Sequence, residues 1–407
     1  MTRNVRLTLS LLAFGGVLFC GNAFGRVRGG VVMNGAEIGG MCYEEAENAV
    51  RAQIPSASLC IKTPRGDFSF PLCVRDNVSR LVQKARRGES LTADVQYVWL
   101  DAESEMKAVC EKVSYAPRDA SVRFSKDGTF EYLPAYQGIG CEYEKSLKAA
   151  LAAIRDGEKS VELVTRSLYP QITESDLKKQ TQLLGTYKTT FNGKNTARKH
   201  NIALACTKIS GMVLPAGGVF SFNETVGKRT EENGFEVASV ILEGEFVPGV
   251  GGGVCQVSTT LMNCAVRAGL EITESRPHSL SVSYVPPSCD AMVSDYSDLK
   301  IKNPHPYPVY IAAKTGESAV EFKIYGMPDG RRYELESITL LRVSPPPEKV
   351  IEGDEDKIMR QEKEGVASES YLLVYEGDAL VSRTLFRRDR YAVVQGIKQV
   401  KRQSELL

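Results

Sequence analysis

The sequence predicts an α+β fold divided among several domains. Short strand-like runs, separated by turn residues such as the Asn-Gly pair at 34–35 and the Asp-Gly pair at 127–128, are interspersed with amphipathic helical runs. Three prolines at 345–347 mark a boundary, after which polar and apolar residues alternate around a hairpin turn at 376–378. At 407 residues the chain has room for about two to four domains.

Residues 1–25 are expected to lie outside the folded domains. A short basic segment precedes an apolar run from Leu7 to Cys20, and small residues follow at Ala23 and Gly25. This order is typical of a signal peptide, and an uncleaved membrane anchor is the alternative. We therefore expect an extracytoplasmic protein, either secreted or held at the membrane by its N-terminus.

The first domain is expected over residues 31–168. It opens with two short strands around the Asn-Gly turn, and the helix that follows places Ala46, Val50 and Ile54 on one face. Further helices are expected near 78–87 and 144–155, and strands near 121–124, 130–132 and 160–164. This mixture of short elements favours an α+β domain.

An odd number of cysteines in an exported chain implies at least one free thiol. The chain has ten cysteines, and nine remain if Cys20 is removed with the signal peptide. Cys60 and Cys73 flank a strand–turn–strand segment with its turn at 65–67, so we predict a disulfide between them. Cys255 is the cysteine that we expect to remain unpaired.

The charge composition argues against nucleic acid as a partner, because the chain has 51 basic and 50 acidic side chains. The three histidines and the cysteines show neither H-x-x-x-H nor C-x-x-C spacing. We therefore expect no metal and no other cofactor. Nothing in the composition indicates an oligomeric state.

The most informative segment lies in the second domain, expected over residues 180–325. A helix is expected near 196–209, and later three consecutive glycines lead into Cys255 and a helix-like run that ends at Gly269. A cysteine at a helix N-terminus lies near unpaired N–H groups and the positive end of the helix dipole, which lower a thiol pKa. Cys255 is therefore a candidate nucleophile, and a small buried core residue is the alternative.

A histidine and an aspartate follow Cys255 in an order that suits a thiol nucleophile. His278 would act as the base, and Asp290 would orient its imidazole ring. A structural hydrogen bond or a metal ligand is the alternative role for His278.

Residues around the cysteine are expected to contact a ligand. The glycines permit close approach, and Gln256, Ser258 and Thr259 offer donors for a carboxylate or an oxyanion. Helix capping is the alternative for the hydroxyl residues, a surface salt bridge for Arg276 and core packing for Tyr284. The predicted binding residues are Gly251, Gly252, Gly253, Gln256, Ser258, Thr259, Arg276 and Tyr284.

Three long motifs of the second domain carry a family resemblance. They are G-G-V-F-S-F-N-E-T-V-G-K-R-T-E-E-N-G-F at 217–235, V-P-G-V-G-G-G-V-C-Q-V-S-T-T-L at 247–261 and R-P-H-S-L-S-V-S-Y-V-P-P at 276–287. In this order, with Arg198 upstream, they resemble the VanW family of bacterial cell-envelope proteins. One departure is Cys289, which replaces the usual glycine before Asp290.

The flanking regions resemble modules that accompany VanW. The V-V-M-N-G-A-E-I-G-G-M opening makes the 31–168 region similar to a peptidoglycan-binding domain, and residues 350–400 resemble a small all-β, glycine-marked module linked to glycan binding. The resemblance thus implies an exported cell-envelope protein that binds the peptide stem or the glycan of peptidoglycan.

Two classes of function remain for the second domain. Cys255 would perform hydrolysis or acyl transfer on wall peptides, or the domain would be a non-catalytic peptidoglycan-binding scaffold. The family name adds a third hypothesis, an accessory protein in vancomycin resistance. Hydrogen-bond reach between Cys255 and His278 in an open cleft would favour the enzyme, and burial of Cys255 among apolar side chains would favour the scaffold.

Overall fold

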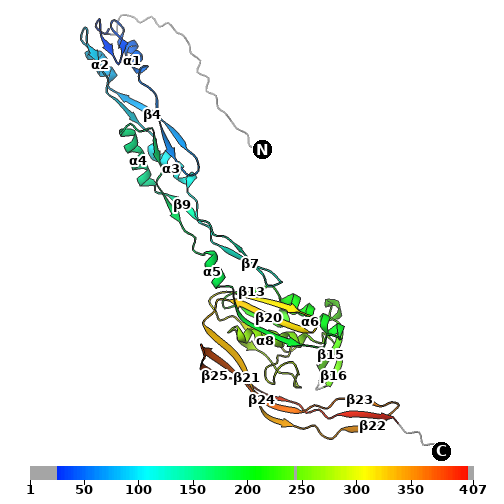
Figure 1. Cartoon of the computed structure of the whole chain (residues 1–407). Helices are drawn as coiled ribbons and strands as arrows, with labels where there is room; N and C mark the ends of the chain where they lie inside the picture. The colour runs from blue at the N-terminus through cyan, green and yellow to red at the C-terminus, as the bar shows by residue number, and fades with distance from the viewer. Residues whose placement is uncertain (1–24, 243–244, 402–407) are drawn as a thin grey trace, which may run out of the picture. The chain divides into compact units, whose positions relative to one another are not determined.

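The computed structural model describes residues 25–242 and 245–401 and confirms the α+β class (Figure 1). The chain divides into two compact units. The first comprises the chain up to Arg118 with Gln137–Tyr169, and the second comprises Asp119–Tyr136 with the chain from Pro170 onward. The signal peptide or anchor predicted at 1–25 lies, apart from Gly25, outside the described residues.

The N-terminal part of the first unit is a small sheet covered by two helices. Its predicted turn is present, with Asn34 and Gly35 at φ values of 49° and 86°, as a tight hairpin requires. Cys42 and Glu45 form a reciprocal capping box at the start of the first helix. The elements are β1 (Val32–Met33), β2 (Ala36–Glu37), α1 (Tyr43–Arg51), α2 (Val78–Lys84) and β5 (Ser90–Leu91).

The rest of the first unit is a four-stranded sheet, in the order β10-β3-β4-β6, and a two-stranded sheet, β11-β9, with two helices packed beside them. Helix α3 was not predicted, although Met106, Val109 and Val113 recur at helical spacing and are buried. The elements are β3 (Ala57–Lys62), β4 (Phe68–Asp76), β6 (Val95–Val98), α3 (Ala102–Val113), β9 (Gly138–Cys141), α4 (Tyr143–Arg155), β10 (Ser160–Glu162) and β11 (Thr165–Leu168).

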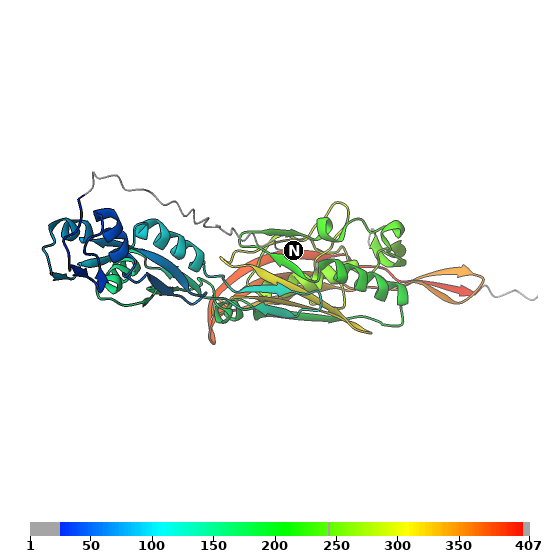
Figure 2. The ribbon, with the colours of Figure 1, turned by 90° about the horizontal axis from the view of Figure 1, so that it is seen from above.

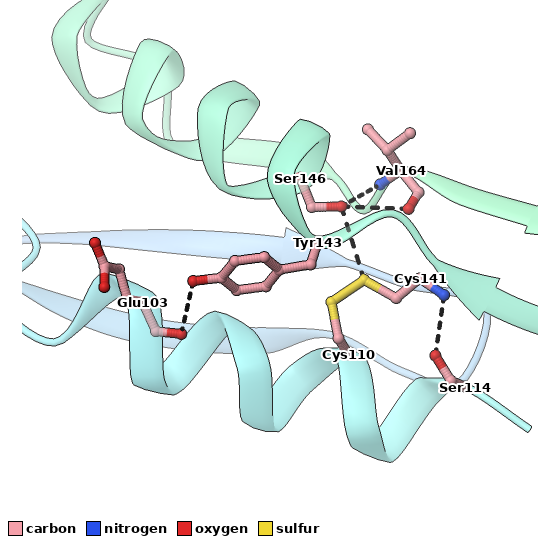
Figure 3. Close-up of a disulfide and its surroundings, with 7 residues drawn as sticks. All are labelled: Glu103, Cys110, Ser114, Cys141, Tyr143, Ser146 and Val164. Atoms are coloured by element: carbon pink, nitrogen blue, oxygen red, sulfur yellow. Dashed lines mark hydrogen bonds between the residues drawn. A yellow bond between two sulfur atoms is a disulfide. The ribbon is translucent and has the colours of Figure 1, made fainter.

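The disulfide of this unit is not the predicted one. Cys60 and Cys73 are free thiols, because the antiparallel register of β3 and β4 places Cys60 opposite Ser69. Cys73 lies roughly 13 Å farther along its strand, whereas a disulfide needs Cα atoms within about 7 Å. The structure instead joins Cys110 of α3 to Cys141 of β9, whose Cα atoms are 5.2 Å apart (Figure 3).

A two-stranded hairpin and a short helix open the second unit. Phe124 and Phe130 of the hairpin pack edge-on against Tyr310, with ring centroids 5.3 and 5.2 Å away. Thr173 and Asp176 form a capping box at the start of the helix. The elements are β7 (Ser121–Phe124), β8 (Phe130–Leu133) and α5 (Glu174–Lys179).

The core of the second unit is an antiparallel sheet, in the order β12-β20-β19-β13, with helices α6 and α8 against it. Alternate residues of β20 are buried, as a one-sided sheet requires. Helix α8 approaches β12 closely, since a Cβ on Gly185 would lie 2.8 Å from the carbonyl oxygen of Cys264. The elements are β12 (Gln182–Thr190), α6 (Thr196–Ile209), β13 (Met212–Leu214), α8 (Val254–Arg267), β19 (Val309–Thr315) and β20 (Ala319–Gly326).

Smaller elements pack beside α6 and α8. A three-stranded sheet has the order β14-β18-β17, and β15 pairs with β16 as a separate hairpin. These elements are β14 (Val219–Ser221), α7 (Phe222–Val226), a 3₁₀ turn (Glu231–Asn233), β15 (Val237–Leu242), β16 (Glu245–Val250), β17 (Glu271–Glu274) and β18 (Lys300–Lys302).

The C-terminal strands form two further sheets in the second unit. The first sheet has the strand order β21-β24-β25 and packs against α8 through β21. The predicted turn between β24 and β25 has Gly377 at φ 59°. The second, β22-β26-β23, extends away from the core in both views (Figures 1 and 2). The elements are β21 (Arg331–Val343), β22 (Lys349–Gly353), β23 (Lys357–Arg360), β24 (Gly365–Glu376), β25 (Ala379–Tyr391) and β26 (Ile397–Lys401).

Candidate active site

A glycine turn places Cys255 in the first turn of helix α8. Gly251 and Gly253 have φ values of 86° and 109°, which side chains with a Cβ rarely adopt, and Gly253 is the N-cap of the helix. A Cβ on Gly252 would lie 2.6 Å from the carbonyl oxygen of Ser239. Each of the three positions therefore requires glycine, two for backbone conformation and one for close packing.

Helix α8 is a rigid support for the cysteine. Nearly all of its residues are buried, and it ends at Arg267, two residues before Gly269, whose φ of 73° fits the predicted helix-terminating glycine. Cys255 itself is only half-buried. The side chain at the helix start is thus held by a buried element while it keeps access to solvent.

The structure brings Cys255, His278 and Asp290 together. Nδ1 of His278 lies 2.6 Å from Oδ2 of Asp290, and the backbone N–H of His278 donates to the same oxygen at 2.8 Å. The His278 ring also hydrogen-bonds the Cys255 thiol, whose Sγ lies 3.4 Å from the carbonyl oxygen of Val293. Since Asp290 engages Nδ1, Nε2 is the nitrogen left for the thiol.

The interactions of the three side chains favour a thiolate–imidazolium pair. Burial alone would raise the pKa of Cys255, but the hydrogen bond and charge of His278 outweigh it, and the pKa lies below its usual value. Burial opposes a charge on His278, yet hydrogen bonds with Asp290 and Cys255 raise its pKa to about 9. Burial likewise opposes ionisation of Asp290, but His278 lowers the pKa of that carboxyl, with help from Arg387.

Two C-terminal residues hold Asp290 from the side opposite His278. Nη2 of Arg387 donates to Oδ1 of Asp290 at 2.8 Å and to its backbone oxygen at 2.6 Å. The hydroxyl of Tyr391 donates to the same Oδ1 at 2.6 Å. No motif marks either residue in the sequence, because both lie in β25, outside the predicted second domain.

The loop before Asp290 needs no glycine. The backbone takes its positive φ, 62°, at Ser288 rather than at Cys289, which is buried. Replacement of the usual family glycine by Cys289 is therefore compatible with the position of Asp290.

A cavity of about 850 Å³ opens beside Cys255 and His278. The three glycines, Gln256 and Tyr284 line it, as does the β15–β16 hairpin. Its charged lining is mostly cationic, with one acidic side chain, Asp295; the cations are Arg198, Lys228, Arg229 and Lys363. The cavity therefore suits a ligand that carries negative charge.

Two arginines give this cavity its charge near the thiol. Arg198 is partly buried, which lowers its pKa, and it donates to Oε1 of Gln256 at 2.8 Å. Arg229 donates to Oδ1 of Asn223 at 2.8 Å and helps to stabilise the Cys255 thiolate. Neither arginine forms an ion pair with a carboxylate in the part of the chain that the structure describes. Sequence reasoning named Arg198 only as part of the family motif.

The other predicted binding residues differ in their positions. Ser258 and Thr259 are fully buried and hydrogen-bond the backbone of Ala291, so they fix the segment after Asp290. Arg276 is exposed, is not among the cavity-lining residues, and accepts the Met292 N–H with its carbonyl oxygen. Tyr284 borders the cavity, and burial raises the pKa of its hydroxyl.

The described ranges contain neither a candidate metal cluster nor a candidate membrane-spanning helix. No group of three or more His, Cys, Asp or Glu side chains there could hold a metal ion. Within the same ranges, no helix combines the length and apolar character that a membrane crossing needs.

Fold and site together define an α+β domain with a Cys–His–Asp cluster at the N-terminus of a buried helix. Residues 197–325 match the family described as "VanW like protein". The resemblance inferred from the three motifs is thereby confirmed, and the chain carries a VanW-like domain.

A relative from Bacillus subtilis (strain 168), "Uncharacterized protein YoaR", is 40% identical over 171 residues. The match covers 42% of this chain and 56% of YoaR, so the chain spans little more than half of that relative's length.

Proposed function

We propose that the VanW-like domain is a cysteine-dependent acyl transferase or hydrolase that acts on peptidoglycan peptides. The observation that carries the proposal is the Cys255–His278–Asp290 arrangement at the wall of an 850 Å³ cavity. Most free cysteines are inert core residues, but a half-buried thiol paired with an oriented, cationic histidine has the features of a nucleophile.

The reaction follows from the positions of the three groups. The Cys255 thiolate attacks the substrate carbonyl carbon and forms a tetrahedral intermediate. His278 donates its proton to the leaving amine as the C–N bond breaks, which leaves a thioester on Cys255. Water or a second amine then attacks the thioester, His278 takes up the proton, and the thiolate leaves. Asp290 keeps the imidazole oriented in both steps.

Negative charge on the intermediate has two nearby stabilising groups. The backbone N–H of Cys255, at the first turn of α8, has no acceptor in the described part of the chain. The Arg198 guanidinium acts electrostatically on the Cys255 thiolate and borders the same cavity. Preorganised donors of this kind stabilise an oxyanion without reorganisation during the reaction.

Peptidoglycan peptides are the proposed substrate for two reasons. The VanW resemblance supports a role in the cell envelope, and the cationic cavity suits the carboxylates of wall peptides. Export of the chain, and wall binding by residues 31–168 and by the glycan-binding-like strands at 350–400, belong to the same proposal. The disulfide between Cys110 and Cys141 supports an oxidising compartment.

Wall digestion with a matched pair of variants tests the proposal. We expect the full chain to release or exchange peptides from purified sacculi, and Cys255→Ser to reduce that turnover by about 10³-fold or more while keeping the fold. Cys264→Ser, in the same helix, is the control for a change of thiol to hydroxyl. Equal turnover by the wild type and Cys255→Ser would overturn the enzyme hypothesis and favour the non-catalytic wall-binding scaffold.

A further inference from the structure

The two loops that carry His278 and Asp290 are both attached to the C-terminal strands. The N–H of Ala392 donates to the carbonyl oxygen of Ser279, one residue after His278, at 2.8 Å. The N–H of Ser288, two residues before Asp290, donates to the Tyr391 hydroxyl at 2.7 Å. The relative position of base and acid is therefore fixed through strand β25 and the residue after it.

Buried serines extend this attachment. Ser288 contacts Ser368 of β24 hydroxyl to hydroxyl at 2.7 Å, and the Ser370 hydroxyl donates to the Ser288 carbonyl oxygen at 2.8 Å. Ser337 of β21 donates to the carbonyl oxygen of Pro287 at 2.6 Å. All three strands of the sheet β21-β24-β25 thus hold the loop before Asp290, and unsatisfied groups there would be costly because Ser288, Ser368 and Ser370 are buried.

Arg387 and Tyr391 act directly on the carboxylate. Oδ2 of Asp290 hydrogen-bonds His278, and Oδ1 accepts hydrogen bonds from Arg387 and Tyr391. Both oxygens therefore have partners, and the carboxylate cannot rotate freely. The side chain of Asp290 is 1% exposed and that of Arg387 12% exposed. Arg387 is fixed in turn by an ion pair with Asp389 at 2.7 Å.

We propose that Arg387 and Tyr391 are positioning residues of the Cys255 site, and that the functional domain extends through β25 rather than ending near residue 325. The proposal rests on the function proposed above. It gives the C-terminal sheet a role that a separate glycan-binding module would not have, because the site is incomplete without it.

The test is the pH dependence of Cys255 alkylation by iodoacetamide in the full chain, followed by peptide mass mapping. Tyr391→Phe keeps the ring and removes one donor to Asp290, and Arg387→Gln removes the guanidinium. We expect alkylation at pH 6.5 to slow severalfold for Tyr391→Phe and about tenfold for Arg387→Gln, with the half-maximal pH moving upward. Arg387→Lys should recover part of the rate.

Arg388→Gln is the matched control, because the neighbouring Arg388 is exposed and pairs with Glu369 instead. Thermal unfolding verifies that each variant is folded. If Arg387→Gln does not fold, the alkylation profiles of Tyr391→Phe and Arg387→Lys decide the test. A lower melting temperature with an unchanged alkylation profile would overturn the proposal, since a purely structural role predicts that result. A reactive wild-type Cys255 without peptide turnover would instead contradict only the proposed function.

Discussion

The two ends of one thiol-bearing helix behave differently. Cys255 and Cys264 both lie in α8, yet the pKa of Cys264 is raised by burial, whereas interactions with His278 lower that of Cys255. Cys264 is fully buried, and Sγ lies 3.5 Å from the carbonyl oxygen of Gly185. A cationic partner and an opening to solvent, more than membership of the helix, distinguish the candidate nucleophile from a core residue.

The largest change in this comparison should come from His278→Ala. Without the imidazolium, burial should dominate the pKa of Cys255 as it does that of Cys264, and alkylation of Cys255 at pH 7 should slow about tenfold or more. Site-resolved iodoacetamide labelling measures both cysteines in one sample. His200→Ala is the control, because His200 is exposed and bonds only the carbonyl oxygen of Gly234 in the described chain. An unchanged rate at Cys255 would show that His278 does not activate the thiol.

An effect of intermediate size is expected in the pH dependence of peptide turnover and of stability. Peptide turnover should fall as pH rises through about 9, the pKa of His278, because the ring then has no proton to give to the leaving amine. The stability of the fold should also fall as pH rises. Because folding raises the pKa of His278 above its ordinary 6.5, its contribution is complete below pH 6.5 and is lost as pH rises through 9. Turnover and melting temperature from pH 6 to 10 test both, and a flat alkaline limb in both would contradict the ion pair.

The smallest expected effect distinguishes the two terminal glycines of α8. Gly253→Ala and Gly269→Ala both force alanine into positive φ, and each should lower the free energy of unfolding by about 1–2 kcal/mol. At Gly253 the new Cβ would lie 3.0 Å from Cγ of Arg198, beside the thiol. Only Gly253→Ala should therefore also slow Cys255 alkylation. Equal alkylation rates for the two variants would mean that the turn supports the fold alone.

Local sequence signals predicted the elements around the thiol well. The three glycines, the helix after them and Gly269 at its end depend on neighbouring residues, and the structure has them as predicted. The order Cys255, His278, Asp290 was enough to name residues that the fold brings together. Helix α3 also carries a local signal, because its buried residues recur at helical spacing.

Contacts between residues far apart in the chain could not be predicted from local sequence patterns. The Cys60–Cys73 prediction failed because strand register, not proximity in sequence, decides which residues face each other across a hairpin. Ser258 and Thr259 looked like ligand donors, and only the fold shows that they hold Ala291. Arg387 and Tyr391 bear no motif, and their contact with Asp290 spans 97 and 101 residues.

This long span has a consequence for the order of assembly. A chain that leaves the ribosome N-terminus first exposes Cys255 and His278 well before β25 has been synthesised. Until then Asp290 lacks the two donors to Oδ1, so the proposed positioning role of Arg387 and Tyr391 implies a poorly activated thiol while the nascent chain is incomplete. Closing so distant a contact is among the slow steps of folding. If Cys255 is the proposed nucleophile, the newly made protein should become active only when the last strands of the second unit are in place.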